Sequence, residues 1–465
     1  MTRETALLSE FVARAVPPQE ALDAAAAAVR DTVGVILAGA IEPAARMVQS
    51  LAADEGRGDS AVLGTSLRTG AGMAAMANGV AAHALDYDDM CFVSLAHPSC
   101  ALMPAALAAC EIAGAPGRTL LEGYVVGFEL ECRLGKAMNP RHYHDRGWHC
   151  TSTIGTVGAA AAAARVLGLT PAETAHALGI AASSACGLKE NLGSMVKPLH
   201  AGMATRNGVM AAQLAQRGYR ASELSLDGPQ GFLAAMDAEH QDLLRAVAGL
   251  DGSTGPVLQA IDDWEILKTG ITVKLYPSCA ATHPPLDVLL DLRHAGELDA
   301  HDIESIDVQV DSMTPRLLIY DRPATGLEGK FSMPFCAAAA VIDGHVGIST
   351  FDVARIQSPD IQALMPKIKM RANAGFDTTP PLSHTTVTVR RRDGRVLERS
   401  SNGARGYPAR PASDAQLAAK FSECARRVLP PAVADEAWAM LSAIEGVEQM
   451  SVLTELLSST PARAS

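Results

Sequence analysis

Apolar residues recur at helical spacing from the start of the chain to about residue 265, and few segments there alternate as strands do. Proline suits the first turn of a helix, so Pro17-Pro18 and Pro98 mark helix starts, and Gly218 marks a helix end. The pattern predicts helices over 19–40, 71–85, 98–113, 119–138, 154–167, 170–185 and 197–218, and a short strand over 61–64. We therefore expect this part to be an all-helical domain.

The pattern changes near residue 266. Ile306, Val308 and Val310 alternate with polar residues, which predicts a strand over 303–311. Asp393-Gly394 is a hairpin turn signal between two further predicted strands. The full set of expected elements is strands over 303–311, 385–389 and 395–399, helices over 284–295 and 332–343, and terminal helical segments over 413–428 and 432–457.

These elements predict a mainly α protein with two domains. Residues 1–265 and 405–465 are expected to form one large helical domain built from both ends of the chain. Residues 266–404 are expected to form a smaller α+β domain inserted into it. A chain of 465 residues is also too long for a single ordinary core.

Composition narrows the class of partner. With 48% hydrophobic and 19% charged residues the chain is a packed globular protein, and with only 4% aromatic residues its core must consist of small aliphatic side chains. A net charge of −12 argues against a nucleic-acid partner. Because the sequence contains no run of 18 apolar residues, we do not expect a membrane span. Nine scattered cysteines and an N-terminus without signal-peptide order indicate a cytoplasmic protein.

Three polar motifs interrupt the alanine-rich helical sequence, each at or just before a predicted helix start. They are His97-Pro98-Ser99, Gly147-Trp148-His149 and Lys197-Pro198-Leu199-His200. Cations are disfavoured at helix N-termini by the helix dipole, so the motifs are expected to bind an anionic ligand there.

An acidic cluster precedes the first of these motifs. Asp86, Asp88 and Asp89 follow the predicted helix 71–85, and one of these carboxylates is expected to face His97 and tune its proton affinity. The alternative is that they are solvated acids at a helix end.

Other chemistries are weaker alternatives. A metal site would use ligand types such as His142, His144, Asp145 and His149, but paired zinc-ligand spacing is absent, so no metal is expected. Cys279 lies close to His283 in sequence and is a possible nucleophile. Gly155-Thr156-Val157-Gly158 follows no strand and lacks the dinucleotide fingerprint, which argues against a nicotinamide or flavin cofactor.

Taken together, the motifs resemble the MmgE/PrpD family, in order and over nearly the whole chain. The matching runs are Ala84-Leu85-Asp86-Tyr87-Asp88-Asp89, His97-Pro98-Ser99, Gly147-Trp148-His149, Gly155-Thr156-Val157-Gly158, Lys197-Pro198-Leu199-His200-Ala201-Gly202, Arg206-Asn207-Gly208, Lys274-Leu275-Tyr276-Pro277-Ser278-Cys279, Thr282-His283-Pro284 and Lys330-Phe331-Ser332.

The resemblance implies a fold, an assembly and a chemistry. It implies a helical domain with a smaller α+β lid domain, a homodimer, no cofactor, and a di- or tricarboxylate substrate. Family activities include 2-methylcitrate dehydration, cis-aconitate decarboxylation and iminodisuccinate epimerisation, each of which makes or quenches negative charge beside a carboxylate.

The resemblance places the family's catalytic and substrate-binding residues on Asp86, His97, His149, Lys197, Lys274 and a tyrosine near Tyr320, and the shared chemistry leads us to expect the following roles. His97 and His149 would transfer protons, with Asp86 orienting one imidazole, and Lys197 and Lys274 would bind substrate carboxylates. Tyr320, aligned to within a residue, would donate a proton.

Two positions depart from the decarboxylase pattern. Met90 stands where a threonine is expected, and Cys279 stands where a histidine is expected, and both changes remove polar contacts to a substrate. We therefore expect a 2-methylcitrate-dehydratase-like hydro-lyase, with an epimerase as the alternative and a decarboxylase after it. A protein that binds a polycarboxylate without turnover is the non-enzymatic alternative.

Overall fold

The computed structural model describes residues 2–236, 247, 250, 264–377 and 382–458. The chain divides into two compact units. The helical unit comprises residues 1–84, 88–271 and 414–465, and the α+β unit comprises residues 85–87 and 272–413. The α+β unit begins and ends a few residues after the expected bounds of 266 and 404. Residues 85–87, which the sequence analysis placed in the helical domain, group with the α+β unit.

The helices predicted between residues 19 and 218 are all present. The helical unit contains α1 (Arg3–Arg14), α2 (Gln19–Gly39), α3 (Pro43–Asp54), α4 (Ala71–Ala84), α5 (Pro98–Ala113), α6 (Gly117–Met138), α7 (Arg141–His144), α8 (Cys150–Val166), α9 (Pro171–Ser184), α10 (Val196–Gln216), α11 (Phe232–Ala235), α13 (Glu265–Lys268), α20 (Asp414–Ala425), α21 (Pro431–Ser442) and α22 (Met450–Leu456). The short strand expected over 61–64 is a two-residue pairing of β1 (Ser60–Ala61) with β2 (Arg68–Thr69).

Small residues allow the central helices of this unit to pack closely. Helix α8 is buried along nearly its whole length and packs against α5, α6, α9 and α10. At the crossing of α4 and α10, a Cβ on Gly202 would lie 2.5 Å from the side chain of Val80 and 2.7 Å from the carbonyl oxygen of Met76. A larger side chain would force these two helices apart.

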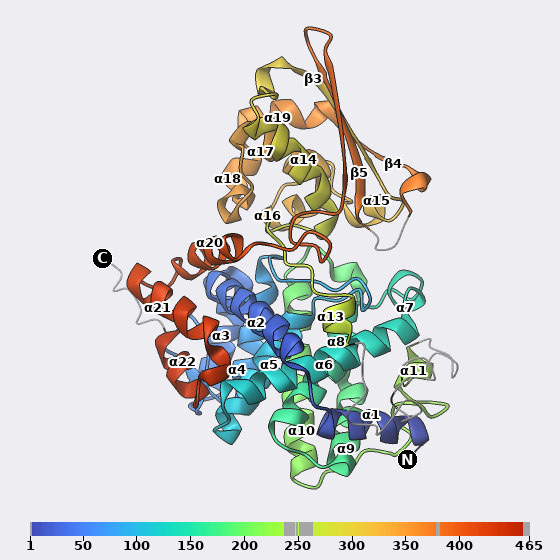
Figure 1. Ribbon diagram of the computed structural model, residues 1–465, viewed down its shortest axis with the longest axis vertical. Coiled ribbons are helices and arrows are strands. Elements are labelled where there is room, and N and C mark those ends of the chain that lie inside the picture. Colours follow the sequence, from blue (N-terminus) through green and yellow to red (C-terminus); the bar gives the residue numbers. More distant parts are fainter. Residues whose placement is uncertain (1, 237–246, 248–249, 251–263, 378–381, 459–465) are drawn as a thin grey trace. The chain divides into compact units, whose positions relative to one another are not determined.

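The two ends of the chain meet in the helical unit. Helices α20 and α21, from the C-terminal part, pack against α2, as Figure 1 shows. A buried ion pair joins them, with Lys420 Nζ 2.7 Å from Asp31 Oδ1.

The prediction of one helical segment over 432–457 is wrong. The segment divides into α21 and α22, and the chain between them turns to meet the start of α6. The backbone N–H of Gly117 donates to the carbonyl oxygen of Val447 at 2.7 Å, and a Cβ on Gly117 would lie 1.9 Å from the carbonyl oxygen of Ile444. A tertiary contact therefore ends a helix that periodicity alone would continue.

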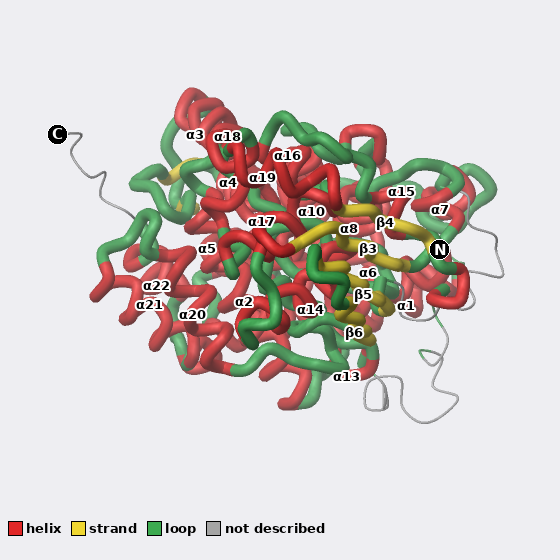
Figure 2. The backbone as a smooth tube through the Cα atoms, turned by 90° about the horizontal axis from the view of Figure 1, so that it is seen from above, coloured by secondary structure: helices red, strands yellow, loops and turns green. Residues whose placement is uncertain are grey.

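The α+β unit is built on a four-stranded sheet in the order β4-β3-β5-β6, visible in Figure 2. Strand β3 pairs with β4 in parallel and with β5 antiparallel, and β5 pairs with β6 antiparallel. Helix α14 packs against β5 and β6, and α17 packs against α14 and β4 (Figure 1). The elements are β3 (Ile303–Val310), β4 (Ile368–Ala372), β5 (His384–Arg391), β6 (Val396–Asn402), α14 (His283–His294), α15 (Thr314–Leu317), α16 (Gly326–Gly329), α17 (Met333–Asp343), α18 (Val353–Ile356) and α19 (Pro359–Leu364).

The alternation predicted for this unit is confirmed. Ile306, Val308 and Val310 are buried on one face of β3, and Gly394 forms the turn between β5 and β6 with φ +86°. The sequence analysis missed β4, in which only Ile368 is buried. The mainly α fold class is thus confirmed, with the strands confined to this sheet and the short β1–β2 pair among the described residues.

Among the described residues no single helix has both the length and the apolar composition of a membrane span; α2 and α3 meet the criteria only together, across a bend of 86°.

Candidate active site

Three helix N-termini carry the basic residues that the sequence analysis singled out. His97 is the N-cap residue of α5, His149 is the N-cap residue of α8, and Lys197 is the second residue of α10. These three helices pack against one another. Neither histidine side chain caps its own helix, so both imidazoles are directed to other partners. His149 and Lys197 are buried.

Two further histidines complete a group that we call the imidazole cluster: His83, His97, His149 and His200. The ring of His83, from the last turn of α4, lies with its centroid 4.5 Å from that of His97 and 5.9 Å from that of His149. The Nδ1 atoms of His149 and His200 lie 3.0 Å apart. The side chains predicted from separate motifs therefore do meet, and His83 lies between two of them.

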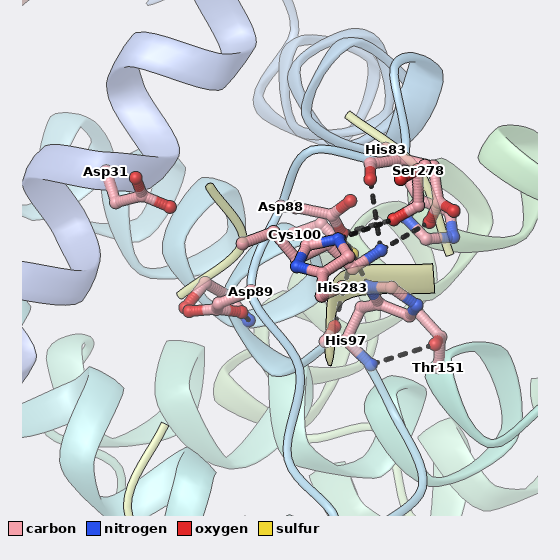
Figure 3. Close-up of polar contacts among 12 residues, drawn as sticks. Asp31, His83, Asp88, Asp89, His97, Cys100, Thr151, Ser278 and His283 are labelled. Carbon is pink, nitrogen blue, oxygen red and sulfur yellow. Dashed lines mark hydrogen bonds and ion pairs between the residues drawn. The ribbon is translucent and has the colours of Figure 1, made fainter. Parts of the chain in front are cut away.

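One buried carboxylate contacts two histidines of this cluster. Asp88 is fully buried, with its Oδ2 2.7 Å from Nδ1 of His83 and 3.3 Å from Nδ1 of His97, as Figure 3 shows. Burial alone would raise the pKa of Asp88, but the two imidazoles outweigh burial and hold its pKa well below the usual value. The expectation that one of these carboxylates faces His97 is confirmed for Asp88.

Burial keeps most of the cluster uncharged. It lowers the pKa of His83 to about 3 and the pKa of His149 well below its ordinary value, and nearby basic groups including Lys197 lower both further. Burial and then Lys197 also lower the pKa of His200. Neutral imidazoles do not oppose the helix dipole, so an anionic ligand is not needed to explain His149 at a helix N-terminus.

The loop from Asp88 to His97 is fixed at both ends. Asp89 accepts hydrogen bonds from the backbone N–H and the hydroxyl of Ser99, in the first turn of α5. The backbone N–H of His97 donates to Oγ1 of Thr151 at 3.0 Å (Figure 3). Burial raises the pKa of Asp89 to about 8, so this carboxyl differs in charge from its neighbour Asp88 at neutral pH.

The α+β unit holds a separate buried pair. Nζ of Lys274 lies 2.8 Å from Oδ1 of Asp86 and 3.0 Å from the carbonyl oxygen of Asp86. Nζ of Lys330 donates to the carbonyl oxygens of Leu85 and Pro277, both at 2.7 Å. Asp86 itself has a positive φ of 52°, which a non-glycine residue seldom adopts.

These contacts change the picture of Asp86 and Lys274. The carboxylate of Asp86, which the sequence analysis expected to orient an imidazole, is the counter-ion of Lys274, and its expected role toward an imidazole stays a prediction. Lys274 was expected to bind a substrate carboxylate, and in this structure its ammonium is fully buried against Asp86. Its role toward a substrate stays a prediction.

The remaining predicted residues lie at separate positions. Tyr320 lies between α15 and α16, and its backbone N–H donates to the carbonyl oxygen of Phe331 at 3.3 Å. Met90 is buried directly after Asp89 in the helical unit. Cys279 is partly exposed, with its backbone N–H bonded to the carbonyl oxygen of Lys330. Their roles stay predictions.

Partners are known for two histidines named in the alternatives of a nucleophilic cysteine and of a metal at residues 142–149. Nε2 of His283 lies 3.2 Å from the carbonyl oxygen of Ser278. His142 has its Nε2 2.7 Å from Oγ1 of Thr153 and its Nδ1 3.1 Å from the carbonyl oxygen of Met236, so both ring nitrogens have protein partners. His142 is thus a buried structural residue.

Donor atoms of His83, Asp88 and His97 lie within 4.8 Å of one another, as in a metal site. Within this group, the 2.7 Å contact of His83 Nδ1 with Asp88 Oδ2 is an ordinary hydrogen-bond distance.

The sequence analysis missed His83 and His200 as members of the site. His83 lies in an alanine-rich, almost fully buried helix, five residues before Asp88. A polar residue in such a helix is a signal that could have found it. His200 stood inside a recognised motif, one helical turn after Lys197, and no role was assigned to it.

Comparison with known proteins identifies the family of the chain. Residues 7–243 match the MmgE/PrpD N-terminal domain and residues 276–445 match the MmgE/PrpD C-terminal domain. The chain is 28% identical over 395 residues to a cis-aconitate decarboxylase from Homo sapiens, covering 83% of this chain and 79% of the relative. It is 26% identical over 465 residues to a cis-aconitate decarboxylase from Aspergillus terreus, covering 95% of this chain and 92% of the relative. Because the two domain matches span most of its length in the right order, the chain belongs to the MmgE/PrpD family.

Proposed function

We propose that this protein is a lyase that acts on a di- or tricarboxylate by moving a proton at a carbon beside a carboxylate. The observation that supports this most is the cluster in which the buried, neutral imidazoles of His83 and His149 interact with Lys197, while His97, His149 and Lys197 stand at three helix N-termini. A neutral imidazole can accept a proton, whereas the ammonium and the helix ends favour the negative charge that develops on the substrate.

In this proposal His97 and His149 transfer protons and Lys197 binds a carboxylate. The low pKa of His149 keeps a lone pair available at neutral pH. Asp88 orients His97 through the 3.3 Å contact of its carboxylate. The substrate-directed roles of Lys274 and Tyr320, and the role of Asp86 in orienting an imidazole, stay predictions.

Decarboxylation of cis-aconitate is the first reaction to test, since the relatives compared above are named for it. In that reaction a C–C bond breaks, CO2 leaves, and a proton is added to the remaining carbon. The dehydration favoured by the sequence analysis gains no support from these relatives. It remains the second candidate, because Met90 and Cys279 supply fewer polar contacts than the decarboxylase pattern.

Proton NMR in deuterated buffer separates the candidates. The purified protein is incubated in turn with cis-aconitate, 2-methylcitrate and an iminodisuccinate-type amino dicarboxylate. Loss of CO2 identifies a decarboxylase, loss of water a hydro-lyase, and deuterium exchange with inversion an epimerase. Thermal stabilisation by these anions with neither product nor exchange would overturn the proposal in favour of a binding protein.

The His149→Asn variant tests the residue assignment in the same assay. It removes the basic nitrogen and is expected to lower kcat/KM about 10²- to 10⁴-fold, the usual contribution of a positioned acid or base. His301→Asn, at an exposed histidine, is the matched control and should retain parental turnover. Parental kcat/KM in His149→Asn would contradict the role given to His149.

A further inference from the structure

We propose that His83 is a positioning residue of this site: through Asp88 it holds Nδ1 of His97 in its N–H form, leaving Nε2 of His97 to exchange the proton. The inference rests on the proposed function and deepens it. Neither the family motifs nor the sequence analysis assigned a role to His83, which lies one residue before the first matching run.

The contacts of Asp88, a hydrogen bond to His83 and an ion-pair distance to His97, favour one tautomer in each ring. A carboxylate only accepts hydrogen bonds, and Oδ2 of Asp88 has Nδ1 of His83 at 2.7 Å and Nδ1 of His97 at 3.3 Å. We therefore infer that each Nδ1 carries a proton, because a nitrogen lone pair at that distance would repel the carboxylate. In the neutral rings the lone pair is then on Nε2. Nε2 of His83 is buried and has no hydrogen-bond partner among the described residues.

The charged groups around His83 indicate that it donates a hydrogen bond to Asp88 as a neutral imidazole. Besides Asp88, the groups that face it are His97, His149 at the start of α8 and Lys197 at the start of α10. On the α2 side, Asp31 interacts with Asp88 and is paired with Lys420. Burial lowers the pKa of His83 to about 3, so this imidazole is neutral while Asp88 remains a carboxylate.

This arrangement has a consequence for proton transfer. When Nε2 of His97 accepts a proton from a substrate carbon, Nδ1 keeps its own proton, and the resulting imidazolium is stabilised by Asp88. Without the donor at His83, a carboxylate buried at this depth would have a raised pKa. Asp88 would then become protonated at a higher pH than in the parent and lose its contact with His97 as a carboxylate.

Two substitutions separate positioning from a merely structural role. His83→Asn places an amide N–H near the former Nδ1 without a ring base, and His83→Leu removes the donor. We expect His83→Asn to keep kcat/KM within about 10-fold of the parent and His83→Leu to lose about 10²- to 10⁴-fold, comparable to a lost proton-transfer group. The acid limb of the kcat/KM profile should move to higher pH in His83→Leu alone, because activity then requires deprotonation of Asp88.

His142→Asn is the matched control, since His142 is also a fully buried histidine of the helical unit with two hydrogen bonds. Its thermal stability should fall, but its acid limb should stay at the parental pH. If His83→Asn is as inactive as His83→Leu, or if His83→Leu keeps the parental acid limb, the proposal is overturned.

A spectroscopic measurement distinguishes failure of this inference from failure of the proposed function. Imidazole ¹⁵N NMR on histidine-labelled full-length protein, with His83→Asn and His97→Asn used for assignment, reports which ring nitrogen is protonated. We expect Nδ1–H for both His83 and His97 at pH 7, whatever substrate the protein uses and even if His83→Leu fails to fold. An Nε2–H tautomer at either residue would overturn the inference; absent turnover with this tautomer present would overturn only the proposed function.

Discussion

At the scale of single residues, three aspartates within four positions have three different surroundings. Asp86 faces the ammonium of Lys274, Asp88 faces two imidazoles, and Asp89 faces the N–H and hydroxyl of Ser99. The left-handed backbone at Asp86 turns the chain at the start of this cluster. Surroundings, rather than residue type, hold the pKa of Asp88 low and raise that of Asp89 to about 8.

The buried pair of Asp86 and Lys274 supports a prediction about the α+β unit. Lys274→Met leaves the Asp86 carboxylate buried without its counter-ion, which should cost about 3–5 kcal/mol of local stability. The double variant Asp86→Asn with Lys274→Met should lose less than Lys274→Met alone, because no unpaired charge remains. Hydrogen exchange of peptides from β3 and β5 measures the local free energy of opening. A double variant that loses the sum of both single losses would contradict this coupling.

At the scale of secondary-structure elements, the site depends on how closely three helices approach. Helices α4, α8 and α10 carry His83, His149 and Lys197 at their ends, and α10 packs against both of the others. A Cβ on Gly208 would lie 2.6 Å from Cβ of Ala159, at the crossing of α10 and α8. Small residues at these helix crossings therefore allow the helices that carry the imidazole cluster to approach closely.

Gly202→Ala tests this dependence on close approach. The added methyl group meets Val80 and the backbone of Met76 at the α4–α10 crossing, so we expect a loss of about 1–3 kcal/mol, as is typical of overpacking. The loss of kcat/KM should be larger than that of a surface variant, because His83 and Lys197 move apart. Urea denaturation and steady-state kinetics measure the two effects. Gly70→Ala, which meets no atom within 4 Å, is the control, and an equal loss in both variants would contradict the argument.

At the scale of the whole molecule, each unit buries charged groups of its own. The helical unit contains Asp88 and the Asp31–Lys420 pair, which joins α2 to α20 across most of the chain. The α+β unit contains Lys274 and Lys330, whose partners include residues 85 and 86 from the distant acidic cluster. In both units, therefore, buried charged groups are paired between segments that lie far apart in the sequence.

Stability should also depend on pH through Glu131. This glutamate on α6 is fully buried, and neither carboxyl oxygen has a hydrogen-bond partner among the described residues. Burial first, and then Cys91 and Asp89, raise its pKa well above the usual value. The folded chain keeps this proton while the unfolded chain releases it above about pH 4.3, so stability is lost as the pH rises through this window.

The Glu131→Gln variant should not lose stability as the pH rises, because its amide carries no titratable proton. Relative to the parent, its free energy of unfolding should increase from pH 5 to pH 8, by up to about 1.4 kcal/mol per pH unit. Urea denaturation at both pH values measures the difference. Glu436→Gln, at an exposed position on α21, should show a far smaller change between the two pH values. A difference between Glu131→Gln and the parent that does not vary with pH would contradict the argument.

Much of the fold could be predicted because its signals are local. The start of α5 at Pro98 and the alternation of Ile306, Val308 and Val310 require only neighbouring residues to interpret. The break between α21 and α22 could not be predicted, since it depends on a hydrogen bond from Gly117, more than three hundred positions away. Strand β4 was missed for a similar reason. Its own five residues do not alternate between buried and exposed positions, and it is a strand because it pairs with β3.

The amino-acid sequence determined by itself that His97, His149 and Lys197 stand at helix starts, because proline, capping position and apolar periodicity act within one or two turns of chain. Only the tertiary structure decided that Asp88 contacts two imidazoles, and that His83 lies between His97 and His149. The reason is physical: the direction of a side chain after a turn, and the pKa that burial gives it, depend on helices that pack from elsewhere in the chain.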